Sequence, residues 1–323
     1  MAATAAQVAA VGIWVDQFAA QMDQIRERLA TALRVLYAGF GGWYNDDLVD
    51  RIARETARLL VADIDIVQGL ADAYAANVLH QITGEAITIP PTRLPETRNG
   101  ADLVGVYRRP AERYRHLVAV GEAPADAEAK ALRRLERMTN MDLAIAARDA
   151  QLAQYGVRHD DGGRRTIGQY RRIVHPELAR TGTCGLCIVA SDRIYSTDEL
   201  MPLHPGCNCT TAPVEGEVDP GNSLNNLALE QLYADAGSTR AEELRQTRYQ
   251  INDHGEYGPV ISRAGDEFKG PADVKPLEED VDRARRMLDQ TLPVLADMRA
   301  SNTPSDVLGY QERLVERLQQ IAA

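Results

Sequence analysis

The sequence contains few cysteine, histidine and large aromatic residues. Its 323 residues include four cysteines, six histidines, two tryptophans and three phenylalanines. No segment reaches the roughly 18 consecutive apolar residues of a membrane span, and the first residues lack the basic region of a secretory signal. We therefore expect no membrane partner and synthesis in a reducing cytoplasm. In that compartment clustered cysteines bind metals more often than they form disulfides.

Several common catalytic motifs are also missing. The chain has no phosphate-binding glycine loop, no H-E-x-x-H helix and no G-x-S-x-G elbow. Its 47 acidic residues outnumber its 36 basic residues, which gives a net charge of -11. This charge argues against a surface that binds nucleic acid everywhere, although a local basic face is compatible with it. Enzymatic activity stays open, and a protein without it is the preferred interpretation.

The apolar pattern predicts a mainly α-helical chain with a helical N-terminal body. A helix is predicted over 8–36, where apolar residues recur every three or four positions and glycines follow. A second helix is expected over 45–82, with Asn45 or Asp46 as its cap. Further helices are expected from about residue 110 to residue 116 and beyond, and over 124–155. Prolines and glycines predict a long loop over residues 84–100.

Past residue 155 the pattern changes. Glycines at 156, 162 and 163 precede short runs with β propensity, which predict strands at 171–174, 187–190, 193–195 and 210–214. Helical pattern returns after Pro220, over 224–236, 238–248, 277–298 and 304–321. The predicted organisation is an α-helical domain over 1–155, a β-rich Cys/His metal-type module over 156–216 and an α-helical C-terminal region over 217–323.

All four cysteines fall within 26 residues, which is the most specific feature of the chain. They form a C-x-x-C pair, Cys184 and Cys187, and a C-x-C pair, Cys207 and Cys209, with His204 just before the second pair. The 19 residues between the inner cysteines are close to the spacing of two-pair zinc sites. We predict a structural Zn²⁺ site, with four thiolates favoured over three thiolates and the imidazole. Clustered thiolates also fit iron.

Two alternatives remain for the same residues. Cys187 or Cys207 could act as a nucleophile with His204 as its base, although no third orienting residue accompanies them. The cysteines could also form disulfides or stay without a ligand. Arginines near the cluster predict a solvated strand face in preference to a phosphate-contacting patch: Arg158, Arg164, Arg165, Arg171, Arg172 and Arg180.

Three other pairs of polar residues are interpreted as structural or as weak candidates for a functional site. Asp63 and Asp65 are two apart on a predicted helix, so they do not share a face, and we expect both to be solvated charges. The His175-Pro-Glu run is expected to form a turn that supports the metal module. The His254-Gly-Glu run lies in an expected loop and is a weak candidate for a contact site.

The cysteine block and its flanks resemble the MuF-like minor head proteins of tailed phages, which are relatives of phage Mu protein F. The form here is similar to that of phages infecting actinobacteria. The resemblance covers roughly residues 100–265 and is densest over 168–214. It is carried by the runs Tyr170–Leu178, Thr183–Cys187, Asp192–Tyr195 and Leu203–Thr210, and by Val106–Pro110, Arg113–Leu117 and His254–Pro259.

The resemblance implies a structural role in head morphogenesis. The expected protein is a minor capsid component, assembled in the host cytoplasm and kept in the virion, in the capsid interior at the portal vertex. Its expected partners are the portal protein and the major capsid or scaffold protein. Some members are thought to bind DNA, so phage DNA is a further expected partner. Many relatives are labelled capsid maturation proteases. A cysteine-type maturation protease and a DNA-binding zinc module acting in packaging or ejection are therefore the alternatives.

Overall fold

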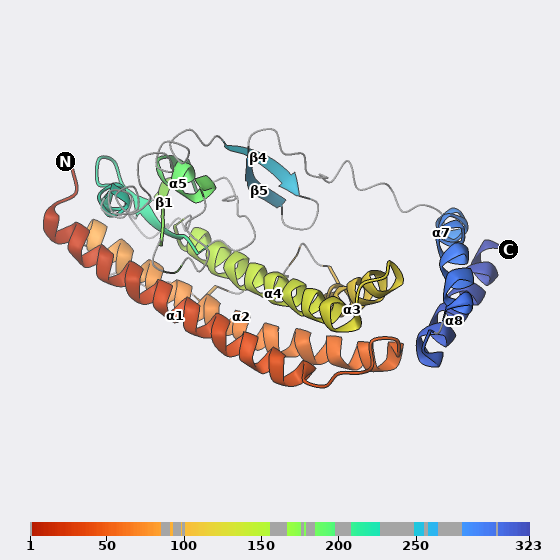
Figure 1. Cartoon of the computed structure of the whole chain (residues 1–323). Helices are drawn as coiled ribbons and strands as arrows, with labels where there is room; N and C mark the ends of the chain where they lie inside the picture. The colour runs from red at the N-terminus through yellow and green to blue at the C-terminus, as the bar shows by residue number, and fades with distance from the viewer. Residues whose placement is uncertain are drawn as a thin grey trace, which may run out of the picture. The chain divides into compact units, whose positions relative to one another are not determined.

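The structure is a computed structural model that describes residues 2–84, 91–92, 98, 101–155, 167–175, 178, 185–197, 208–226, 249–254, 258–263, 280–301 and 303–323. Within these ranges the chain is mainly α-helical, with a small sheet in the middle of the sequence (Figure 1). This confirms the predicted fold class, a helical N-terminal body followed by a small β-containing module and a helical C-terminal part. None of the described helices is long and apolar enough to cross a membrane.

Four helices make up the N-terminal body: α1 (Ala5–Tyr37), α2 (Asp46–Thr83), α3 (Leu103–Ala119) and α4 (Pro124–Tyr155). These bounds agree with the predictions, except that α3 begins before Pro110. The carboxylate of Asp102 accepts hydrogen bonds from the N–H groups of Val104 and Gly105, and it thereby caps the helix upstream of the proline. The predicted cap of α2 is confirmed, because the N–H of Leu48 donates to Asn45 Oδ1 at 3.1 Å.

The described residues divide into two compact units. Unit 1 comprises Met1–Leu33, Arg58–Ala101 and Glu136–Pro271, and unit 2 comprises Arg34–Ala57, Asp102–Leu135 and Ala272–Ala323. Helices α1, α2 and α4 each contribute one part to unit 1 and the other part to unit 2. The domain division at residues 155 and 216 stays a prediction.

In unit 1 the first part of α1 runs antiparallel to the last part of α2 (Figure 1). The rings of Phe18 and Tyr74 stack with their centroids 4.6 Å apart, and Gln7 Nε2 donates to the carbonyl oxygen of Ile82 at 3.4 Å. Apolar residues of both helices are buried at helical spacing, which explains why the two long segments pair. They include Val11, Val15, Met22, Leu29, Leu60, Val67, Ala71 and Val78.

The expectation that Asp63 is a solvated charge was wrong. Asp63 is buried and forms an ion pair with Arg28 of α1. Its position in α2 directs it toward α1, because it follows Leu60 by three residues on the side that packs. Asp65, two residues further along, is exposed as predicted.

A three-stranded antiparallel sheet, in the order β2-β1-β3, lies in unit 1. Its strands are β1 (Gln169–Ile173), β2 (Ile194–Ser196) and β3 (Thr210–Val214), which confirms the strands expected at 171–174, 193–195 and 210–214. Tyr170 in the central strand lies opposite Tyr195 of β2 and Pro213 of β3. A proline is compatible with β3 because this strand is at the edge of the sheet.

The strand expected at 187–190 was wrong, because this stretch belongs to a short helix, α5 (Gly185–Ser191). Periodicity alone does not distinguish a short apolar run in a strand from one in a buried helix. Here the run is helical, and packing in the interior accounts for its apolar side chains, since Cys187, Ile188 and Ala190 are all buried.

A second, two-stranded antiparallel sheet follows and was not predicted. It pairs β4 (Tyr249–His254) with β5 (Gly258–Arg263), so His254 ends a strand where a loop was expected. Residues 255–257, and with them the rest of the His254-Gly-Glu run, lie outside the described residues. Residues 220–226 are helical. The remainder of the helix predicted at 224–236 and the whole of that at 238–248 lie outside the described residues too.

In unit 2, α7 (Asp280–Ala300) and α8 (Ser305–Ala322) form a helical hairpin close to the predicted ranges. Pro293 lies inside α7 and does not end it. Trp43 stacks on Tyr114 with centroids 4.7 Å apart, and Tyr310 meets Tyr44 edge to face at 5.4 Å. The guanidinium of Arg115 lies 4.1 Å from the centre of the Tyr310 ring.

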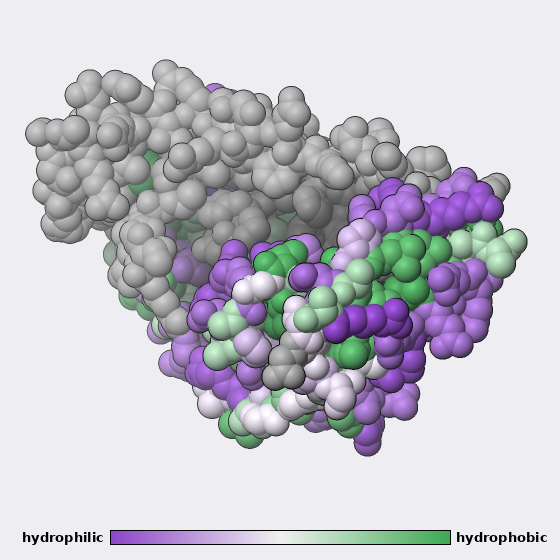
Figure 2. Space-filling model, turned by 45° about the vertical axis from the view of Figure 1, so that its right-hand side comes forward, coloured by the Kyte–Doolittle hydropathy of each residue, from purple (hydrophilic) through white to green (hydrophobic). Residues whose placement is uncertain are grey.

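Much of the described surface on the side shown in Figure 2 is hydrophilic, with smaller hydrophobic areas between. Large apolar side chains that stay exposed are scattered over several helices and one strand. They are Ile13, Val35, Val61, Ile66, Val120, Ile194, Leu292 and Ile321.

Candidate functional site

The candidate site is the part of unit 1 where the described cysteines meet. Cys187 of α5 is 5% exposed and packs with Met141 of α4 and Val174. Cys209, just before β3, packs against the same cluster. The structure therefore brings one cysteine of each predicted pair to a single place. The other three predicted ligands, Cys184, His204 and Cys207, lie outside the described residues.

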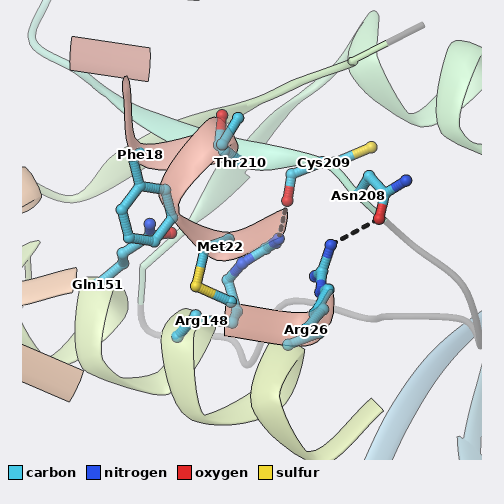
Figure 3. Close-up of a pocket in the computed structure, with 11 residues that line it drawn as sticks. Phe18, Met22, Arg26, Arg148, Gln151, Asn208, Cys209 and Thr210 are labelled. Carbon is cyan, nitrogen blue, oxygen red and sulfur yellow. Dashed lines mark hydrogen bonds between the residues drawn. The ribbon is translucent and has the colours of Figure 1, made fainter. Parts of the chain in front are cut away.

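The metal site itself stays a prediction. Within the part of the chain that the structure describes, no group of three or more His, Cys, Asp or Glu side chains is arranged to hold a metal ion. The two described cysteines nevertheless fit one requirement of a two-pair site, since they come from different pairs and contact the same cluster. In Figure 3 the sulfur of Cys209 points away from Arg148, while the carbonyl oxygen of Cys209 faces it.

Two arginines hold the chain at Asn208 and Cys209. Arg26 of α1 donates from Nη1 to Asn208 Oδ1 at 2.6 Å, and Arg148 of α4 donates from Nη2 to the carbonyl oxygen of Cys209 at 3.0 Å (Figure 3). Arg148 is 3% exposed, so its hydrogen bond is shielded from water. These contacts fix the backbone at Asn208 and Cys209, and Cys209 is the described member of the second cysteine pair.

Thr211, two residues after Cys209, is held by three side chains. Its carbonyl oxygen accepts from the hydroxyl of Tyr74 at 2.6 Å and from that of Tyr155 at 3.3 Å. Its own hydroxyl donates to Gln151 Oε1 at 2.7 Å. Burial raises the pKa of Tyr74 well above its ordinary value and raises that of Tyr155 too, so both phenols stay protonated and able to donate.

His175 supports the start of β3, in agreement with its predicted structural role. Its Nε2 lies 3.1 Å from the hydroxyl oxygen of Thr210, and the imidazole is buried. The carbonyl oxygen of His175 accepts from the N–H of Leu178 at 3.2 Å. Glu177 lies outside the described residues.

The strand arginines are buried, so the expected solvated face and the alternative phosphate patch were both wrong for them. Arg171 Nη2 forms an ion pair with Asp219 at 2.6 Å, and Nη1 of Arg171 donates to the carbonyl oxygen of Ser191 at 3.1 Å. Arg172 is fully buried. Neither guanidinium is available to a polyanion. The other arginines of that set, Arg158, Arg164, Arg165 and Arg180, lie outside the described residues.

Asn225 connects β1 with the end of α5. Its Nδ2 donates to the carbonyl oxygens of Arg172 and Ser191, at 2.6 Å and 3.1 Å, and its Oδ1 accepts from the N–H of Val174 at 3.1 Å. Because Ser191 ends the helix that carries Cys187, this one amide holds the first cysteine segment against the central strand.

A cavity of about 20 Å³ lies beside the two arginines that contact Asn208 and Cys209. The residues that line it include Phe18, Met22, Arg26, Arg148, Gln151 and Thr210 (Figure 3). A space of this size holds about one water molecule.

The environment of Cys187 is that of a structural cysteine, since a nucleophilic thiol is at least partly exposed and Cys187 is buried. Its burial therefore argues against Cys187 as the nucleophile of the predicted alternative. The other candidate nucleophile, Cys207, and its predicted base, His204, lie outside the described residues.

The side chains that position the cysteine segments were not among the predicted site residues. Arg148, Gln151 and Tyr155 recur at spacings of three and four on α4, so they share one face of the helix. Polar residues in that pattern, on a helix that is otherwise apolar on the same side, were a usable signal. No sequence signal marks Asn225, whose partners lie 34 to 53 residues earlier in the chain.

No protein-family model, curated protein or solved structure matches this chain. A functional assignment therefore depends on the sequence motifs and on the geometry above.

Proposed function

We propose that this chain is a structural component of a tailed-phage head, in which a metal ion bound by the clustered cysteines fastens two chain segments to a helical frame. The proposal has two parts that can be tested separately. The phage part is supported by the resemblance of the cysteine block and its flanks to MuF-like minor head proteins. The expected partners are the portal protein and the major capsid or scaffold protein.

The observation that carries the structural part is the contact of Cys187 and Cys209 with one cluster, formed by Met141 and Val174. Each cysteine belongs to a segment that buried side chains attach to the rest of unit 1. A metal ion bound by both cysteine pairs would link two segments that already contact the same cluster. Structural zinc sites contribute about 10–16 kcal/mol of apparent folding free energy in small modules.

The metal part is tested by elemental analysis of the purified chain for zinc and iron, with free thiols counted by mass spectrometry. We expect about one metal ion per chain, and its loss in Cys184→Ser, Cys187→Ser and Cys209→Ser. Val174→Thr is the matched control, because it also places a hydroxyl in the cluster but removes no sulfur. It should lower stability and keep the metal. Unchanged metal content and stability in Cys184→Ser, or disulfides between the pairs, would exclude a cysteine metal site.

The phage part is tested on purified particles of the phage that encodes the chain. Antibody detection should find the chain in filled heads, in few copies relative to the major capsid protein. Cys207→Ser removes a predicted metal ligand and the remaining candidate nucleophile, and it should reduce incorporation without leaving an unprocessed capsid protein. Absence of the chain from the particles would contradict the virion role and leave the metal result unaffected. A capsid protein left uncleaved in the variant would instead indicate the protease.

A further inference from the structure

The small cavity in unit 1 is lined by two guanidinium groups and a buried amide and, among the described residues, by no carboxylate. It measures about 20 Å³ and lies between α1, α4 and residues 208–210 (Figure 3). We propose that this cavity binds one chloride ion. The inference goes beyond the structural role above. It depends neither on a bound metal nor on the phage assignment, because it uses no cysteine sulfur.

The amide of Gln151 supplies one hydrogen-bond donor to this site. The side chain is 1% exposed, and its Oε1 accepts from the hydroxyl of Thr211 at 2.7 Å. Its Nε2 is buried and has no hydrogen-bond partner among the residues that the structure describes. Leaving a buried donor without a partner is unfavourable. Because Gln151 lines the cavity, an acceptor bound there would satisfy this N–H group.

Arg26 of α1 and Arg148 of α4 bring positive charge to the same cavity from two helices. Their hydrogen bonds to Asn208 Oδ1 and to the carbonyl oxygen of Cys209 hold both guanidinium groups in place (Figure 3). These acceptors are neutral, so they do not cancel the charges. Asp149 interacts electrostatically with Arg148 but is not among the residues that line the cavity. The lining therefore favours a negative ligand.

Size and chemistry together select the ligand. A space of about 20 Å³ holds one particle of about the size of a water molecule, which excludes a phosphate group. A water molecule would need acceptors for its own protons, and the two neutral oxygens nearby already accept from the arginines. A chloride ion needs only donors. Its attraction to the arginines is weakly screened, because most of the other lining side chains are apolar: Phe18, Ala19, Met22, Ala144 and Ala147.

The test compares thermal unfolding of the full chain in sodium chloride and in sodium gluconate, followed by circular dichroism. Gluconate is too large for the cavity, and equal ionic strength keeps the screening of surface charges the same. Chloride should raise the unfolding temperature by about 3 °C relative to gluconate, because an ion that binds only the folded state stabilises it. The dependence on chloride concentration should follow a single binding site.

Gln151→Glu should remove the shift caused by chloride, because the new carboxylate repels the ion and takes over its role beside the arginines. It keeps an acceptor for the hydroxyl of Thr211, so in gluconate it should be at least as stable as the unchanged chain. The matched control is Gln154→Glu on the same helix. Gln154 Nε2 donates to Asp72 Oδ1 at 2.6 Å, so this variant places two carboxylates together. It should unfold at a lower temperature in both salts and keep the shift caused by chloride.

Two results would overturn the proposal. The first is the same difference between chloride and gluconate in the unchanged chain and in Gln151→Glu, since general salt effects act on both. The second is a loss of stability in gluconate as large for Gln151→Glu as for Gln154→Glu, which would show that the cavity holds water or no ligand. Metal content is measured separately and should be equal in the two salts, so failure of the metal assignment leaves this test intact.

Discussion

Arg98 and Asp142 form an ion pair in the interior of unit 1, with 2.8 Å between Nε and Oδ1 and side chains that are 1% and 0% exposed. The guanidinium of Arg98 also lies within 3.5 Å of the carbonyl oxygen of Met138. The backbone of Arg98 has a φ of 54°, a left-handed conformation that is uncommon for a residue other than glycine. Residues 84–100 were expected as a loop, and the ion pair attaches Arg98 of this segment to α4.

Asp142→Ala should lower the free energy of unfolding by about 3–5 kcal/mol, because it leaves the Arg98 guanidinium buried without its counter-charge. Denaturation in urea, followed by circular dichroism, measures the loss. The double variant Arg98→Met with Asp142→Leu should lose less, since no buried charge remains.

The exposed pair of Arg299 with Glu312 is the comparison for this prediction. Its side chains are 59% and 44% exposed, so Glu312→Ala should cost less than about 1 kcal/mol. A loss in Asp142→Ala no larger than that in Glu312→Ala would contradict the role given to the buried pair.

Asn225→Asp should destabilise unit 1 by about 2–4 kcal/mol. The carboxylate can still accept from the N–H of Val174, but it cannot donate to the carbonyl oxygens of Arg172 and Ser191, and it places a charge in the interior. Thermal unfolding measures the effect. Asn226→Asp is the control, because the neighbouring side chain is exposed and should tolerate the change.

Asp149→Asn should stabilise the chain in a pH-dependent way. Burial raises the pKa of Asp149 from 3.8 to about 6, and Arg148 opposes this shift. The folded state thus binds the proton more tightly than the unfolded state. The stability that this group contributes is present below about pH 4 and is lost as the pH rises through about 6.

At about pH 7.5 the Asp149→Asn variant should therefore exceed the unchanged chain in unfolding free energy by about 1–3 kcal/mol, and the difference should vanish below about pH 4. Urea denaturation across this range measures it. A difference that does not vary with pH would show that the carboxylate is not the cause.

Tyr74→Phe should cost about 1–2 kcal/mol, because it leaves the carbonyl oxygen of Thr211 without its shorter hydrogen bond. Tyr155→Phe should cost less, since its hydroxyl lies 3.3 Å from the same oxygen. Hydrogen exchange of the β3 amides should quicken more in the first variant than in the second. The reverse order would contradict the assignment of Tyr74 as the main support of β3.

Sequence reasoning succeeds for the elements whose signals are local. The helices α1, α2 and α4 are predicted by apolar residues that repeat over many turns, and the cap at Asn45 by a residue type next to that pattern. It fails for α5, where a short apolar run is too short to show a period, and for the pair of β4 with β5, where only a loop around residues 254–259 was expected.

Sequence by itself determined the mainly helical class, the three strands of the central sheet and the location of the cysteine pairs, because spacing and periodicity belong to neighbouring residues. Tertiary structure alone decided which charges are buried. Arg171 pairs with Asp219, 48 residues later, and Arg98 pairs with Asp142 of α4. Tertiary structure also decided that Cys187 and Cys209 meet at one cluster, since only packing brings distant segments into contact.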